Sequence, residues 1–195
     1  KDIALYREHS SVKGRKDFLK QFVQNIESYD EDLFIKEYNA SFEDLEDGQT
    51  FDLGNIDVVA YTAPGHTKGM MVFLVKQDRT IVFGDACGVF TLFCTPESTS
   101  LEEYVVTLDK LKGLMPQYDR ILRQHGTCES PLSLVDEDID IVRSILDGTD
   151  DHQPSEFNGI KCFIARRIDP ETRGQRLDGK EGNIIYIPEK IRKDS

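Results

Sequence analysis

The stretch APGHTKGMMVFLVKQDRTIVFGDACG, residues 63–88, decides how this chain folds. It contains two apolar runs, MMVFLVK at 70–76 and TIVF at 80–83, that are rich in the β-branched and aromatic residues typical of strands. The three residues QDR between the runs are short enough to connect them as a β-hairpin. A further strand, IDVVAYT at 56–62, comes directly before this stretch and precedes its Pro-Gly turn.

Helices and strands alternate along the rest of the chain, which indicates an α/β protein with a layered sheet. The helix after Ser100 begins with a capping box, Ser100 and Glu103, and Pro116 ends it. Gly148 is expected to cap the C-terminus of a later helix, the one predicted at 133–147. The other predicted elements are helices at 14–28 and 133–147, strands at 119–123, 160–165 and 183–187, and a polar loop at 149–158.

Length and composition favour one ordinary globular domain over residues 1–195. The formal net charge of −12 argues against binding to nucleic acid or to an anionic membrane surface. The chain shows neither an 18-residue apolar run nor a signal peptide at its start. Its four cysteines form no CxxC motif, so we expect reduced thiols and a cytoplasmic protein.

Three polar residues follow predicted strands, where layered α/β folds collect their reactive groups. They are His66 in the PGHT turn, Asp85 in the GDACG segment and His125 in the HGT segment. Two imidazoles and one carboxylate are ligands that suit zinc or non-haem iron. Each residue alone is a weak signal, because a histidine in a loop or a Gly-Asp turn is commonplace. His9 and His152 lie in polar surroundings and are interpreted as surface residues.

The order strand–PGHT–hairpin–GD–helix–strand–HG resembles the second half of metallo-β-lactamase-fold hydrolases, which include glyoxalase II-like thioesterases and lactonases. The resemblance covers about residues 50–147 and implies an αβ/βα sandwich. It also implies that His66 completes one metal site, Asp85 bridges two metals and His125 ligates the second. Two zinc ions, with iron or manganese as further possibilities, would activate water to attack a small ester, thioester, lactone or related bond.

The chain departs from this family at the diagnostic HxHxDH motif, which the sequence does not contain. We therefore expect that the first part of the sandwich is missing from this chain. A companion N-terminal segment or a homodimer would then complete the core. The residues present supply one histidine for each metal and the bridge between them. Because a zinc site normally takes about four ligands, this chain alone should bind metal poorly.

Several interpretations stay open beside the hydrolase and its small-molecule substrate. One is an iron-dependent oxidoreductase of the same fold; another is a non-catalytic binding protein that has lost its metal site. A nuclease of this fold is disfavoured by the negative charge. Cys87 and Cys128 are near enough in sequence to approach the site, although small buried residues are the more ordinary role. The chain also contains a basic cluster that comprises Arg166, Arg167, Arg173 and Arg176. This cluster could hold a substrate carboxylate or phosphate, or form a solvated loop.

Overall fold

The structure is a computed structural model that describes residues 2–36, 41–125, 128–172 and 174–193. Contacts within the chain divide it into two compact units, Lys1–Asp44 and Leu45–Ser195. Each unit is described by itself. The expectation of a single domain over residues 1–195 remains a prediction. Of the described helices, none combines the length and the apolar character that crossing a bilayer requires.

The first unit is built from short helices. They are α1 (Ile3–Ser10) and α2 (Val12–Leu19), followed by the 3-10 turns η1 (Ile26–Ser28) and η2 (Glu31–Leu33). Ser11 caps α2 by accepting a hydrogen bond from the Gly14 amide at 3.0 Å. The ammonium group of Lys16 reaches back to the Tyr29 carbonyl at 2.9 Å and thereby ties α2 to the segment after η1.

The helix predicted over residues 14–28 is wrong in both of its bounds. The observed helix begins earlier and ends at Leu19, and Asn25 adopts a left-handed conformation with φ of 57°. Phe18 and Phe22 contact each other, yet 62% and 70% of these residues stay exposed. A helix gains most of its stability from burying an apolar face. The spacing of four residues between Phe18 and Phe22 was therefore not enough to extend α2 beyond Leu19.

A six-stranded sheet forms the centre of the second unit. The predicted hairpin is confirmed, since Phe73 lies opposite Val82 in antiparallel register. All neighbouring pairs are antiparallel except β4 and β6, which run parallel. The strands in spatial order are β1 (Gln49–Asp52), β2 (Asp57–Thr62), β3 (Met71–Val75), β4 (Thr80–Gly84), β6 (Arg120–Arg123) and β7 (Glu129–Ser130).

A second sheet of four strands contains β5 (Thr91–Phe93), β10 (Ile184–Tyr186), β9 (Ile160–Ile164) and β8 (Gln153–Phe157) in that order. The polar loop predicted at 149–158 is therefore wrong, because β8 occupies part of it and pairs with β9 along its whole length. Its residues QPSEF are mostly polar, as suits an edge strand, where Pro154 is tolerated. The predicted strands in β9 and β10 are confirmed.

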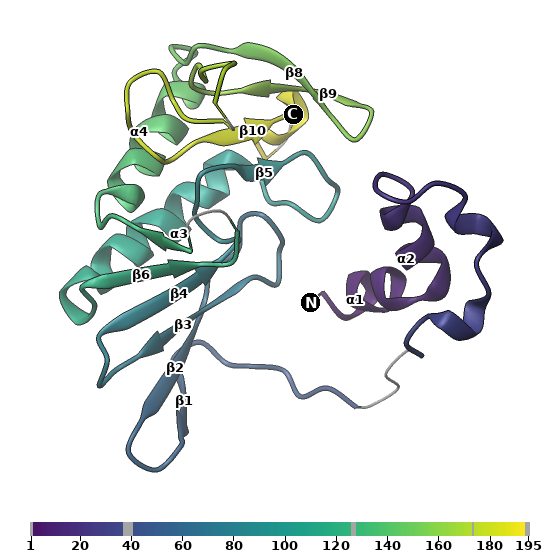
Figure 1. The fold of residues 1–195 in the computed structure, drawn as a ribbon. Coiled ribbons are helices and arrows are strands. Elements are labelled where there is room, and N and C mark those ends of the chain that lie inside the picture. The colour runs from purple at the N-terminus through teal and green to yellow at the C-terminus, as the bar shows by residue number, and fades with distance from the viewer. Residues whose placement is uncertain (1, 37–40, 126–127, 173, 194–195) are drawn as a thin grey trace. The chain divides into compact units, whose positions relative to one another are not determined.

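Two helices, α3 (Leu101–Leu114) and α4 (Leu134–Leu146), pack against each other and against the larger sheet. Figure 1 shows both helices on one side of that sheet. The capping box of α3 is confirmed, with Ser100 and Glu103 exchanging hydrogen bonds. After α3, the short 3-10 turn η3 (Met115–Gln117) contains Pro116; another, η4 (Pro188–Lys190), follows β10. These layers confirm the predicted α/β class.

Candidate metal and substrate site

His66 lies in the turn between β2 and β3, and contacts with the α3 region fix that turn. A Cβ on Gly65 would lie 2.6 Å from the ring of Tyr104, so only glycine fits this approach. The Thr107 hydroxyl donates to the Pro64 carbonyl at 2.6 Å, and the Ser98 hydroxyl donates to the His66 carbonyl at 2.8 Å. The turn that carries His66 is therefore held by the first turns of α3 and by the residues before it.

The imidazole of His66 is oriented by β5. Its Nδ1 lies 3.0 Å from the Leu92 carbonyl oxygen, which can only accept a hydrogen bond. Nδ1 must then carry the proton, and Nε2 is left with a lone pair. A backbone carbonyl on one ring nitrogen is the arrangement that commonly fixes a metal-binding histidine.

Asp85 and His125 meet at the adjacent ends of two parallel strands. Asp85 follows β4 and His125 follows β6, and Asp85 Oδ1 lies 3.4 Å from His125 Nε2. The Asp85 side chain is 35% exposed and that of His125 is 75% exposed, so both can reach a ligand from solvent. The structure thus brings together two of the three residues proposed as metal ligands; their role as ligands remains a prediction.

The donor set matches zinc in residue type and falls short in number. Across the described ranges, no three or more His, Cys, Asp or Glu side chains are grouped as a metal ion requires. Even a catalytic zinc usually has three protein ligands. The residues Gly126 and Thr127, which follow His125 in the HGT segment, lie outside the described residues. The part of the chain described here therefore offers a partial metal site.

A buried carboxyl that sequence reasoning missed, Asp138 on α4, holds the segment that follows Asp85. Its Oδ2 accepts hydrogen bonds from the Cys87 thiol at 3.1 Å and the Gly88 amide at 3.3 Å. Among described residues its Oδ1 has no hydrogen-bond partner. Burial raises the pKa of Asp138 to about 8, even though these two hydrogen bonds act to lower it. The signal in the sequence was its helical spacing from Leu134, Ile141 and Ile145, all of them buried.

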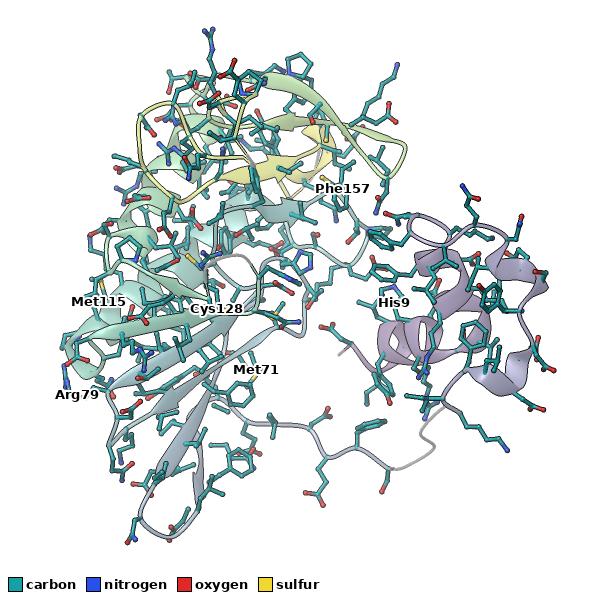
Figure 2. The ribbon with its side chains drawn as sticks, in the orientation of Figure 1. His9, Met71, Arg79, Met115, Cys128 and Phe157 are labelled. Carbon is teal, nitrogen blue, oxygen red and sulfur yellow. The ribbon has the colours of Figure 1, made fainter. Side chains whose placement is uncertain are left out.

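Cys87 is fully buried, and burial raises the pKa of its thiol well above the ordinary value. Cys128 is exposed and lies just beyond β6, as Figure 2 shows.

Of the basic cluster, Arg176 is almost entirely buried and pairs with Asp178 at 2.5 Å, while Arg173 lies outside the described residues. His152 is exposed as expected, with its ring stacked on Phe163 at 3.6 Å between centroids. His9 is likewise exposed.

A cavity of about 760 Å³ opens beside Asp85 and His125. The segment 174–181, before β10, forms one of its walls, and α4 fixes that segment through Glu137. The carboxylate of Glu137 accepts hydrogen bonds from the amides of Glu181 and Gly182, both at 2.9 Å. Two adjacent acidic residues of α4 thus hold both loops that flank the cavity.

Comparison with known proteins gives two curated relatives. The chain is 31% identical over 90 residues to the probable polyketide biosynthesis zinc-dependent hydrolase BaeB of Bacillus velezensis. It is 29% identical over 90 residues to the probable polyketide biosynthesis zinc-dependent hydrolase PksB of Bacillus subtilis. Over the matched segment the chain is thus similar to proteins described as zinc-dependent hydrolases.

The likeness to these relatives is partial. Each match covers 45% of this chain and 38% of the relative, so the chain spans well under two thirds of the relatives' length. No family model matches the sequence. Among solved structures, a metallo-beta-lactamase from Pontibacter korlensis has a TM-score of 0.43 and 18% identity, covering 49% of this chain and 46% of that one.

Proposed function

We propose that this chain is part of a zinc-dependent hydrolase of the metallo-β-lactamase fold, in which His66, Asp85 and His125 are metal ligands. The observation that carries the proposal is the pairing of Asp85 with His125 at 3.4 Å at the mouth of a cavity. The zinc-dependent hydrolases among its relatives support it. Zinc, when bound, lowers the pKa of water to about 7 and polarises a carbonyl group.

The side chains of this chain supply the positioning that such chemistry needs. The Leu92 carbonyl fixes the His66 ring so that its Nε2 lone pair is free to bind an ion. Asp85 and His125 present a carboxylate and an imidazole from two rigid strand ends. We extend the proposal to a dinuclear centre, with iron or manganese as alternatives, and to small ester, thioester or lactone substrates. A homodimer or a companion segment would supply the remaining ligands.

Hydrolysis of a panel of esters, thioesters and lactones tests this function. The protein is stripped of metal with a chelator and then reconstituted with zinc, manganese or iron. We expect zinc to restore hydrolysis, and the variant His125→Ala to lose at least a hundredfold in kcat/KM, as loss of a metal ligand does. His9→Ala, which changes an exposed histidine elsewhere in the chain, serves as the control. Hydrolysis that survives in both the metal-free protein and His125→Ala would contradict the proposal.

One observation favours a second candidate, a non-catalytic binding protein. The described segments bring no three metal-binding side chains together, as a protein with a lost site would also show.

An iron-dependent oxidoreductase is tested in the same samples by following oxygen consumption after reconstitution with iron. We also infer a reducing, cytoplasmic setting, because Cys87, Cys94 and Cys162 are free thiols. The negative charge supports the absence of nucleic-acid and membrane partners.

A further inference from the structure

The cavity beside Asp85 and His125 is lined in part by apolar residues from three separate parts of the fold, which together are called its apolar wall. Val89, Phe90 and Leu92 come from the segment that links β4 to β5 and from β5 itself. Phe157 comes from the end of β8, where Figure 2 labels it, and Ile185 comes from β10. Small-molecule sites are typically concave, mostly apolar and between about 300 and 1,000 Å³ in volume, which matches this cavity.

Leu92 connects this wall to the candidate metal ligands. Leu92 lines the cavity, and its carbonyl accepts the hydrogen bond from His66 Nδ1 at 3.0 Å. Asp85 and His125 line the same cavity. A molecule whose apolar part lies on this wall therefore has its other end beside the residues proposed to hold the metal.

The ring of Phe90 occupies the space that a side chain at Gly174 would need. Gly174 has φ of +95°, and a Cβ there would lie 2.6 Å from Cε2 of the Phe90 ring. Only glycine allows the segment before β10 to approach the ring this closely. The ring of Phe90 thus forms part of the wall and lies against the backbone at Gly174.

The charged groups of the lining balance one another. Arg123 and Lys180 are cationic, whereas Asp85 and Glu181 are anionic. The Arg123 guanidinium is largely buried; it donates to the Ser130 hydroxyl at 2.5 Å and lies 3.8 Å from Glu181. The charged side chains of the lining thus add no net charge of their own, and the preference for an apolar group rests on the apolar wall.

We propose that this cavity binds the uncharged, apolar acyl group of the substrate, and that Phe90 and Phe157 set the size of that group. The inference rests on the proposed hydrolase function and narrows its substrates to esters or thioesters of apolar acids. The acyl carbonyl would face Asp85 and His125, and the hydrocarbon part would lie against the wall.

Binding can be measured without turnover, using straight-chain 2-ketones as uncharged analogues that cannot be hydrolysed. The chain has no tryptophan, so Phe157→Trp places a single reporter of fluorescence in the wall. Leu53→Trp, at a residue 69% exposed and absent from the lining, is the matched control. We expect saturable emission changes only in Phe157→Trp, with affinity rising about fourfold for each added methylene group from acetone to 2-octanone.

Changes at Phe90 give a second readout that does not depend on the reporter. Phe90→Ala should shift the preference to longer or branched ketones, Phe90→Leu should shift it less, and Gly174→Ala should weaken the long ketones by displacing the ring. Binding without chain-length dependence, or equal responses in both tryptophan variants, would overturn the inference. Ketone binding in a protein that hydrolyses nothing would refute the proposed function and leave this cavity assignment standing.

Discussion

Replacing Asp138 by asparagine should change how the stability of the protein depends on pH. The carboxyl group is fully buried, and burial raises its pKa from 3.8 to about 8. Between these values the folded protein keeps the proton while the unfolded chain releases it. Stability due to this group is therefore fully present below pH 4 and is lost as pH rises towards 8.

The magnitude follows from the size of the shift. Each pKa unit corresponds to about 1.4 kcal/mol, so ionisation of Asp138 costs up to roughly 6 kcal/mol of the free energy of unfolding at pH 8. The asparagine side chain would still accept the hydrogen bonds from Cys87 and Gly88, and it cannot ionise. Between pH 5 and 8 the stability of Asp138→Asn should fall less steeply than that of the unmodified protein, by about 1.4 kcal/mol per pH unit.

Urea unfolding at pH 5, 6, 7 and 8 measures this difference directly. Asp140→Asn is the control, because Asp140 is an exposed residue of the same helix. It makes the same change of side chain on α4 without touching the buried hydrogen bonds. Parallel stability curves for Asp138→Asn and the unmodified protein would refute the view that burial keeps this carboxyl protonated.

Three other substitutions test the packing around the site, each by the free energy of unfolding in urea. Gly182→Ala should lower the free energy of unfolding by about 1–3 kcal/mol, since its Cβ would lie 2.4 Å from Asp138 Oδ1. Unchanged stability would mean that the segment before β10 moves away from Asp138 without cost. Ser100→Ala should cost about 1 kcal/mol by removing the α3 cap, whereas the exposed Val106→Ala should cost less. Tyr104→Phe should cost about 1–3 kcal/mol, because its hydroxyl donates to a buried carbonyl, that of Ala86, at 2.6 Å.

The elements with strong local signals were predictable from the sequence. The hairpin of β3 and β4 has two apolar runs around a three-residue turn, and α3 has a capping box and a proline after its end. The edge strands carried no such signal. Both β1 and β8 are short and largely polar, and they become strands by pairing with a neighbour, which local sequence does not encode.

The candidate site was predictable in part. Residues at strand ends were expected to meet, and the parallel pairing of β4 with β6 brings Asp85 beside His125. The hydrogen bond that orients His66 comes from Leu92, which is 26 residues away along the chain. Asp138 is one of seven acidic residues within 136–151, and the sequence does not distinguish it from the others. Only the tertiary packing shows that it is the fully buried one.

Zinc content tests the central claim, that His66, Asp85 and His125 bind metal. Native mass spectrometry of the protein, saturated with zinc and then desalted, gives the number of ions held by each copy. The account predicts bound zinc that is reduced or lost in His66→Ala, Asp85→Asn and His125→Ala, and retained in the control His9→Ala. Zinc retained at full stoichiometry in all three variants would contradict it.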